Sequence, residues 1–503
     1  MISLEDLNAL LTILERVWFQ ALSVVTLLLD VTATLHVLLH KRPVSAKLAW
    51  IGLILLSPIV GAALYTVFGI NRIVRRATRL RAERGFEARE EDALVAAERA
   101  SNAEDLLDED GLLATSDIPD RLVAIAHTTA MVTGAPLLGG NEVTMLRDGD
   151  EAYPKMLEAI EAAQRSITMT TYIFDADEWG ERFVEALAAA HERGVAVHVL
   201  IDAIGMWYSW PTSARKLRAR GVDARAFLPL RLRRFAFLNL RLHRKVMVID
   251  GTRGFTGGIN IRGHHVIASD TAHPTHDVHF AIEGPVVWQL QRSNVEDWYF
   301  TTGVLLEGDA YFARTSSEGS VYARGIIDGP DEDFESLRLV MQSALRAARE
   351  RVVIITPYFI PDEALVSALE VCATSGVVVD IILPAASNLR FVDWASRPLW
   401  GTLLERGCRI WLVSESSAFD HAKLMTVDGA WSLIGSANWD PRSLKLNFEF
   451  NMECYDSGVA AGIDALAARK LEGATRWTLQ MHQARPGVEV LRDELFHLGA
   501  PYL

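Results

Sequence analysis

The chain has 503 residues, half of them hydrophobic, and a formal net charge of −14 at pH 7. Its length exceeds one typical domain and predicts about three units. The acidic balance argues against a general nucleic-acid binder, whose surface is usually basic. The positive mean hydropathy of +0.15 is high for a purely soluble enzyme. The cysteines, Cys372, Cys408 and Cys454, form no metal or disulfide pattern, so we expect inert thiols in a reducing compartment.

Two apolar stretches open the chain. Leu48 to Ile70 contains no charged residue and exceeds the roughly 20 helical residues that a bilayer core requires, so we predict a membrane span. Val17 to Leu39 contains Asp30 and His36. An Asp near the bilayer centre costs about 2.5–3.5 kcal/mol, which a Leu- and Val-rich segment can offset. We predict a second span here, with an interfacial or buried helix as the alternative.

Charges beside these stretches predict their orientation. The connection between them carries Lys41, Arg42 and Lys47, and the second stretch is followed by an arginine cluster, Arg72, Arg75, Arg76, Arg79, Arg81 and Arg84. Because the richer basic cluster should remain in the cytoplasm, two spans place the following domains and the N-terminus inside. Acidic residues stand where a signal peptide would be basic (Glu5, Asp6 and Glu15), so no cleaved signal is expected.

The next segment has a different composition. From Glu87 to Asp117 it is rich in Glu, Asp and Ala and has almost no aromatic residues, which is typical of a helical or flexible tether. We therefore expect an N-terminal transmembrane hairpin over residues 1–75 and an acidic linker over 76–135.

Two halves with similar patterning follow, at 136–318 and 319–503. In the first, apolar runs predict strands at 167–174, 195–201 and 245–249, with a helix at 181–193. The second repeats this order, with strands at 352–355, 377–383 and 423–427 and a helix at 362–375. Alternating strands and helices predict layered α/β domains. We expect the halves to pack face to face as a pseudo-dimer.

A spaced motif occurs once in each half. His243, Lys245 and Asp250 precede Gly257, Gly258 and Asn260, while His421, Lys423 and Asp428 precede Gly435, Ser436 and Asn438. Both copies read H-x-K-x4-D-x6-G-[G/S]-x-N. Two complete copies in one chain are very unlikely by chance. Phosphodiester chemistry can use two histidines, one to attack phosphorus and one to protonate the leaving oxygen.

This duplicated motif resembles that of the phospholipase D superfamily, and more of the chain is similar to bacterial cardiolipin synthases. The similar stretches are GSANWDPRSLKLNFEFN (435–451), FTGGINIRGHH (255–265), YIFDADEWG (172–180) and TPYFIPDEAL (356–365). The resemblance implies two phospholipase D-like α/β sandwich domains and covers nearly the whole chain, except 87–111. Asn388 stands where the resembled family is expected to have an aspartate.

Roles can be assigned to the motif residues. Lys245 and Lys423 would neutralise the phosphodiester oxygens, and Asn260 and Asn438 would donate hydrogen bonds to them. One neutral histidine attacks phosphorus and the other donates a proton, since a reference pKa of about 6.5 leaves both forms accessible. The resemblance implies that His243 is the nucleophile and His421 the acid and base.

Carboxylates should orient the two imidazoles. The candidates are Asp250, Asp428 and Glu449, and Asp277 replaces Glu449 in the first half because the same offset there gives Thr271. For the motif aspartates, a turn-capping role is the equal alternative.

Five further histidines, His264, His265, His273, His276 and His279, lie close together in the sequence. Their spacing matches no standard ligand set, so we expect solvated or structural side chains. The resemblance implies neither a metal nor a cofactor.

Basic and aromatic residues alternate between Trp207 and Arg244. The aromatic members are Trp207, Tyr208, Trp210, Phe227, Phe235 and Phe237, and the basic members are Arg215, Lys216, Arg218, Arg220, Arg225, Arg231, Arg233, Arg234 and Arg241. Such a block suits anionic headgroups, with aromatic rings at the interface. The alternative is an ordinary basic surface helix followed by a strand.

Together with these features, the resemblance implies a membrane phosphatidyltransferase that makes cardiolipin from two phosphatidylglycerol molecules and releases glycerol, through a phosphohistidine. The expected partners are an anionic phospholipid and the membrane, not nucleic acid, and the expected location is the inner (cytoplasmic) membrane as a multi-pass protein. Alternatives are a hydrolytic phospholipase D that releases phosphatidic acid, a nuclease of the superfamily, and a non-catalytic membrane scaffold. Phosphatidylethanolamine remains open as the donor lipid.

Overall fold

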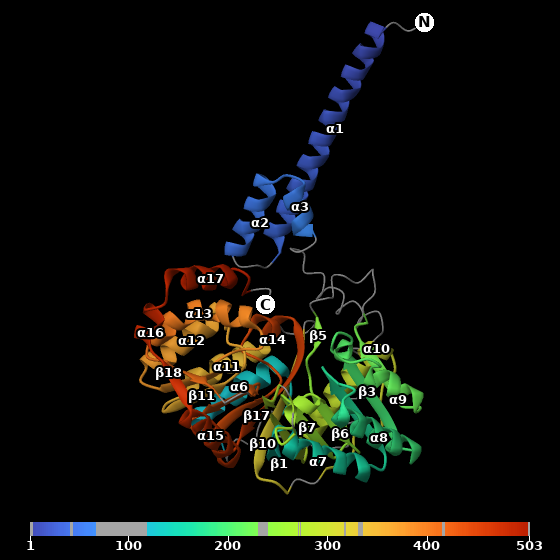
Figure 1. Ribbon diagram of the computed structural model, residues 1–503, viewed down its shortest axis with the longest axis vertical. Helices are drawn as coiled ribbons and strands as arrows, with labels where there is room; N and C mark the ends of the chain where they lie inside the picture. Colours follow the sequence, from blue (N-terminus) through green and yellow to red (C-terminus); the bar gives the residue numbers. More distant parts are fainter. Residues whose placement is uncertain are drawn as a thin grey trace. The chain divides into compact units, whose positions relative to one another are not determined.

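The computed structural model describes residues 4–40, 44–66, 118–229, 240–269, 271, 273–315, 318–329, 335–414 and 418–500. The chain divides into two compact units, Met1–Arg76 and Ala77–Leu503 (Figure 1). The expected acidic tether, Glu87 to Asp117, and the arginine cluster at 72–84 lie outside the described residues.

The N-terminal unit contains α1 (Leu4–Leu39), α2 (Val44–Leu56) and α3 (Val60–Leu64). Within α1, Arg16–Leu39 is 24 residues long with a mean hydropathy of 2.0, which is sufficient to cross a membrane. Over its described residues the second apolar stretch is not one helix, because α2 ends at Leu56 and α3 begins at Val60. The membrane span expected over 48–70 stays a prediction. Helix α2 ends before Pro58, because proline lacks an N–H and its ring disfavours helical backbone in the preceding residue.

The folded part of the second unit begins earlier than the sequence pattern predicts. Helix α6 (Asp120–Thr133) lies inside the expected linker, yet Leu122, Ile125 and Ala126 are buried in a core with α11 (Ser336–Ala347). The helix ends at Gly134, whose left-handed backbone (φ 64) lets its N–H donate to Ala130 O. Residues 120–133 therefore belong to the folded unit and not to the linker expected over 76–135.

The strands of the two halves follow one repeated order. In the first half this order is β1 (Leu138–Arg147), β9 (Val278–Glu283), β7 (Arg253–Gly257), β6 (Val246–Ile249), β2 (Ser166–Thr171), β3 (Ala196–Asp202) and β4 (Asp223–Phe227). In the second it is β10 (Val321–Asp328), β17 (Asn447–Tyr455), β16 (Trp431–Gly435), β15 (Leu424–Val427), β11 (Arg351–Ile355), β12 (Val378–Pro384) and β13 (Arg409–Val413), with β18 (Ala474–Trp477) added. Pairing directions also match, since β2–β3 and β11–β12 are parallel while β2–β6 and β11–β15 are antiparallel.

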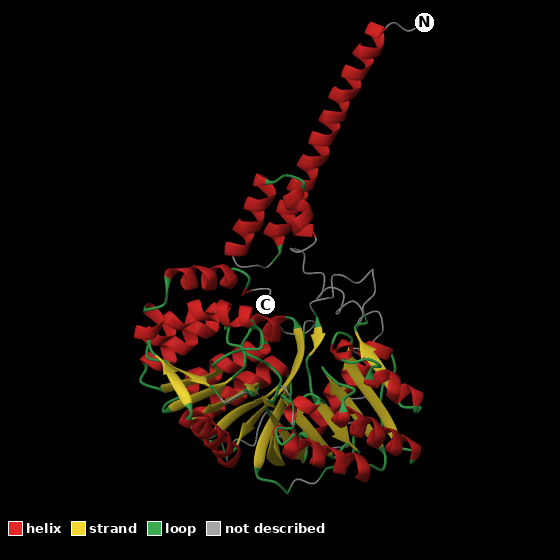
Figure 2. Ribbon diagram, in the orientation of Figure 1, coloured by secondary structure: helices red, strands yellow, loops and turns green. Residues whose placement is uncertain are grey.

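Helices cover these strands in both halves (Figure 2). The first half carries α7 (Asp148–Ala162), α8 (Glu178–Glu192), α9 (Ser213–Ala219) and α10 (Val287–Thr302). The second carries α12 (Glu363–Thr374), α13 (Arg390–Glu405), α14 (Pro441–Lys445), α15 (Ser457–Glu472), α16 (Leu479–Gln483) and α17 (Gly487–His497). The α/β class and the duplication predicted from the sequence are confirmed.

The two halves are joined through strands and through a shared core. Strand β1 pairs antiparallel with β10, which makes one continuous sheet. A separate hydrophobic core contains Val246 and Phe280 from the first half together with Ile355 and Phe450 from the second. Burial of apolar surface between the halves stabilises them as one body, as expected for a pseudo-dimer.

Two short cross-half strand pairs determine where the motif histidines lie. Strand β5 (Arg241–Leu242) pairs parallel with β17 of the second half, and His243 N donates to Phe448 O at 2.9 Å. Strand β14 (Phe419–Asp420) pairs with β8 (Thr275–His276) of the first half, and His421 N donates to His276 O at 2.7 Å. Each histidine thus follows a strand that is paired with the opposite half.

Candidate active site

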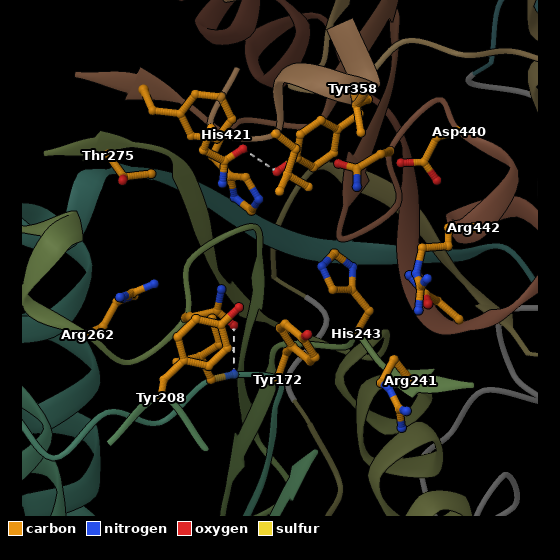
Figure 3. Close-up of a pocket in the computed structure, with 18 of the residues that line it drawn as sticks. Tyr172, Tyr208, Arg241, His243, Arg262, Thr275, Tyr358, His421, Asp440 and Arg442 are labelled. Carbon is orange, nitrogen blue, oxygen red and sulfur yellow. Dashed lines mark hydrogen bonds between the residues drawn. The ribbon is translucent and has the colours of Figure 1, made fainter. Parts of the chain in front are cut away.

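A cavity of about 560 Å³ receives side chains from both halves, and His243 and His421 both line it (Figure 3). The remaining lining residues are Tyr172, Ile173, Tyr208, Arg241, Asn260, Arg262, His265, Thr275, Tyr358, Ile360, Asn388, Leu389, Phe391, Val392, Phe419, Asn438, Asp440, Arg442 and Asn447. The structure therefore brings the two motif histidines to one cavity.

Glu449 contacts the imidazole of His243. Its Oε1 and Oε2 lie 2.9 and 3.0 Å from His243 Nδ1, so with Nδ1 as the donor, Nε2 carries the lone pair. Ser436 Oγ and Asn447 Nδ2 also donate to this fully buried carboxylate. Burial alone would raise the pKa of Glu449, but His243, Lys245 and Ser436 outweigh it and lower the pKa. Burial lowers the pKa of His243, against the opposing effect of Glu449, and so favours the neutral imidazole.

Asp277 contacts the second histidine in the same way. Asp277 Oδ2 lies 2.7 Å from His421 Nδ1. A Cβ at Gly258 would lie 2.1 Å from Asp277 Oδ1, so glycine is required at this motif position, where the second copy has Ser436. Burial, followed by the charges of Lys423 and Lys245, holds the pKa of His421 well below its ordinary value.

The two histidine–carboxylate pairs cross between the halves. His243 of the first half pairs with Glu449 of the second, and His421 of the second pairs with Asp277 of the first. Two of the four candidate orienting carboxylates, Glu449 and Asp277, thus contact the imidazoles.

The other two carboxylates lie elsewhere, which corrects their expected role as orienting groups. Asp250 accepts from the backbone amides of residues 164–166 at 2.7–3.3 Å, and Asp428 accepts from those of residues 349–351 at 2.8–2.9 Å. Both residues have left-handed backbone, with φ of 52 and 51. They therefore stabilise equivalent turns at the starts of β2 and β11, which is the turn-capping alternative.

Lys245 and Lys423 are buried beside the histidines but do not line the cavity. Lys245 Nζ donates to His243 O at 2.6 Å, and Lys423 Nζ donates to His421 O. Burial lowers the pKa of Lys245 to about 7 and that of Lys423 to about 8. Each lysine therefore places an ionisable amine next to a motif histidine, outside the cavity lining.

The two motif asparagines line the cavity at equivalent positions. Asn260 Oδ1 accepts a hydrogen bond from Ile173 N at 3.1 Å. The Nδ2 of the same amide group therefore points away from Ile173 N. Asn438 hydrogen-bonds Asp440. Burial raises the pKa of Asp440 to about 6, and its carboxylate accepts from Ser443 N at the start of α14.

Several lining residues were not singled out from the sequence. Arg262 lies two positions after Asn260, and Asp440 lies two positions after Asn438, so equivalent positions carry opposite charges. Arg262 pairs with Asp175 at 3.1 Å and contributes to lowering the pKa of His421. His265, expected from the sequence to be solvated or structural, also lines the cavity and lies near His421, with ring centroids 6.5 Å apart. The similar stretches at 255–265 and 435–451 contain Arg262 and Asp440, but no spacing rule identified these two residues as part of the site.

Tyr172 and Tyr358 each lie beside one of the two motif histidines, and Asn388 contacts Tyr358. Each tyrosine follows a parallel strand, β2 or β11, and the Tyr172 ring lies 5.4 Å from His243 while the Tyr358 ring lies 6.3 Å from His421. Tyr358 Oη donates to Asn388 Oδ1 at 2.8 Å, so the atypical Asn388 does contribute to the cavity.

The described part of the basic–aromatic block reaches the cavity. Trp207, Tyr208 and Trp210 are 71%, 56% and 81% exposed, and Tyr208 and Arg241 line the cavity. Phe227 is buried, and residues 230–239 lie outside the described residues. Exposed aromatic rings therefore adjoin one wall of the site.

Comparison with known proteins identifies the family. A model described as "Cardiolipin synthase, PLD-like domain" matches residues 156–270 and 341–470, and one described as "Phospholipase_D-nuclease N-terminal" matches residues 28–69. A cardiolipin synthase of Geobacillus sp. (strain WCH70) is 33% identical over 368 residues, covering 73% of this chain and 72% of that protein. The chain belongs to the cardiolipin synthase family.

Similarity to this family extends beyond the catalytic halves. A cardiolipin synthase of Alkalihalophilus pseudofirmus is 29% identical over 485 residues, covering 96% of this chain and 94% of that protein. The phosphatidylserine synthase of Haemophilus influenzae Rd KW20 shares the fold, with a TM-score of 0.60 at 16% identity over 75% of this chain and all of that one. The cardiolipin synthase family match and the long apolar helix α1 together indicate a membrane protein.

Proposed function

We propose that this chain is a membrane phosphatidyltransferase that makes cardiolipin from two molecules of phosphatidylglycerol and releases glycerol. The observation that carries the proposal is the crossed arrangement of His243–Glu449 and His421–Asp277 around one cavity, in a chain of the cardiolipin synthase family. With both Nδ1 atoms paired to carboxylates, both Nε2 atoms are oriented to act on a single phosphodiester.

The first step forms a phosphohistidine. His243 Nε2 attacks phosphorus and the bond from phosphorus to the glycerol headgroup oxygen breaks. His421 enters this step as the imidazolium, a form that the negative charge of the bound phosphodiester favours, and its Nε2 gives that oxygen a proton, so glycerol leaves neutral. Buried Lys245 and Lys423 supply positive charge behind the imidazoles, which offsets charge that develops on the phosphoryl oxygens. Asn260 and Asn438 donate hydrogen bonds to those oxygens.

The second step transfers the phosphatidyl group. A hydroxyl of another phosphatidylglycerol loses its proton to His421 and attacks phosphorus, and the bond to His243 breaks. One phosphodiester replaces another, so the exchange is close to balanced and no nucleotide is consumed. Apolar residues of the cavity, such as Ile173, Ile360 and Phe391, disfavour water, which would otherwise release phosphatidic acid.

Arg262 is suited to the second lipid. It lies on the side of the cavity near His421, the base that activates the acceptor hydroxyl, and its guanidinium pairs with Asp175. The acceptor carries its own phosphodiester, and arginine binds such groups through paired N–H donors. We assign Arg262 to that phosphodiester.

We place the catalytic halves on the cytoplasmic side of the cytoplasmic membrane. Support comes from the arginine cluster at 72–84, which directly follows the apolar N-terminal region.

Product analysis tests the proposed reaction. Full-length protein incubated with phosphatidylglycerol vesicles should yield cardiolipin and glycerol in equal amounts, His421→Ala should abolish both, and the exposed-residue control His127→Ala should retain both. Phosphatidic acid without cardiolipin would establish the hydrolase instead. No lipid conversion by folded wild-type protein would favour the scaffold.

A further inference from the structure

The second apolar stretch reverses direction at its centre. A Cβ at Gly61 would lie 2.3 Å from Leu53 O and 2.7 Å from Ile54 Cα, whereas residues so separated in a continuous helix lie about 12 Å apart. Ile59, between α2 and α3, has a left-handed backbone with φ 67, which is rare for a β-branched residue. Helices α2 and α3 therefore form a tight hairpin (Figure 1).

This hairpin packs against the C-terminal part of α1. Lys47 Nζ donates to Leu38 O at 3.0 Å near the hairpin base, and Tyr65 Oη lies 2.6 Å from His36 Nδ1. The Tyr65 ring is also 5.3 Å from that of Trp50 in α2. The C-terminal end of α3 therefore lies beside the C-terminal end of α1, close to α2.

The hairpin is too short to cross a bilayer. Helix α2 has 13 residues, which rise about 20 Å against a hydrocarbon core of about 30 Å. At its tip, Ile59 N donates a long hydrogen bond of 3.4 Å to Asp30 Oδ1 in α1. From Asp30 to Leu39, α1 rises about 14 Å, so the tip reaches about two-fifths of the length of the Arg16–Leu39 segment, which rises about 35 Å.

The polar and apolar groups at the tip of the hairpin suit a position inside the hydrocarbon core. A reversal in hydrocarbon leaves backbone amides without water, and Asp30 provides an acceptor for one of them, which accounts for an acidic residue in an otherwise apolar segment. The outer surface of the tip is apolar, with Leu55, Leu56 and Val60 exposed by 64%, 86% and 58%. These side chains suit lipid rather than water.

We propose that α2 and α3 form a re-entrant hairpin that enters one leaflet and leaves by the same face, with α1 as the full span. The residues before α1 then lie on the face opposite to the catalytic halves. This replaces the expected two-span arrangement with an internal N-terminus. It also puts Lys41, Arg42 and Lys47 on the same face as the arginine cluster at 72–84, as the positive-inside rule requires, whereas two full spans separate the basic groups.

Site-specific labelling tests this topology in full-length protein expressed in a bacterial cytoplasmic membrane. Ser3→Cys, Arg42→Cys and Arg81→Cys are exposed separately to a membrane-impermeant maleimide in right-side-out and inverted vesicles. Wild type is the control, since Cys372, Cys408 and Cys454 are buried. We expect Arg42→Cys and Arg81→Cys to label in inverted vesicles only, Ser3→Cys in right-side-out vesicles only, and Leu56→Cys at the tip in neither.

Other labelling patterns overturn the proposal. Arg42→Cys and Arg81→Cys on opposite faces would establish two full spans, and all three sites on one face would establish a hairpin without a span. Labelling of Leu56→Cys from either side would place the tip in water. Each variant is also assayed for cardiolipin, so that a failed topology is distinguished from a failed enzymatic assignment.

Discussion

Glu449, in the second half of the duplicated fold, contacts His243 of the first half, with Oε1 2.9 Å from Nδ1. The reciprocal pair, Asp277 and His421, is separated by 2.7 Å. Neither half therefore supplies both members of either of these two pairs. Activity should require both halves in one folded body.

Glu449→Gln should reduce kcat by about 10²- to 10⁴-fold, because a neutral amide can hold the wrong imidazole tautomer. The charge of Glu449 raises the pKa of His243, so its removal should also shift the acid limb of the kcat/KM profile to lower pH. Asp277→Asn is the matched variant for His421. Activity close to wild type in both variants would contradict the crossed arrangement.

A donor with a good leaving group should separate the two histidines. With a p-nitrophenyl ester of phosphatidic acid, departure needs no proton, so His421→Ala should release one equivalent of nitrophenolate and retain a phosphatidyl group on His243. His243→Ala should release none. Mass spectrometry of the rapidly quenched protein locates the adduct. An adduct on His421 in His243→Ala would reverse the assigned order.

The lysines should determine the alkaline limit of activity. Burial lowers the pKa of Lys245 to about 7 and of Lys423 to about 8. Their charges are present below these values and lost above them, so kcat/KM should fall as pH rises through about 7 to 8. Lys245→Arg retains its charge and should move the alkaline limb upward, unlike the exposed-residue control Lys155→Arg. An unmoved limb in both Lys245→Arg and Lys423→Arg would exclude this origin.

Asp250→Ala should affect stability more than chemistry. It removes the acceptor for the amides of residues 164–166, at a cost of about 2–4 kcal/mol in the free energy of unfolding. Thermal unfolding in detergent measures this loss, and kcat per folded molecule should stay within about threefold of wild type, because no catalytic step uses the residue. Asp428→Ala should behave alike. Unchanged stability with activity abolished would restore a catalytic role.

Arg262→Ala should alter the choice of acceptor. Loss of the guanidinium should raise the KM for phosphatidylglycerol as acceptor and increase phosphatidic acid relative to cardiolipin, while transfer to a small alcohol such as ethanol should change little. Arg262→Lys should recover part of the cardiolipin yield, since it retains charge without the paired donors. Equal losses with both acceptors would indicate a general structural role.

The local sequence predicted those features that depend on short separations. The H-x-K-x4-D-x6-G-[G/S]-x-N spacing identified both histidines and both asparagines of the cavity, because one strand–turn–strand unit carries each copy. Apolar runs identified the strands for the same reason. Asp250 and Asp428 could not be assigned in this way, because a carboxylate that is near a histidine in sequence can accept from backbone amides and not contact the imidazole.

The duplication, the apolar N-terminal region and the two motif histidines can all be recognised from the order of the amino acids. The fold was needed to show that each of the two imidazoles contacts a carboxylate of the opposite half, because such contacts join residues like His243 and Glu449, which are distant along the chain. The fold was also needed to show that the second apolar stretch reverses direction between α2 and α3. Hydropathy records how apolar a segment is, whereas the direction of the chain depends on backbone geometry at a single turn.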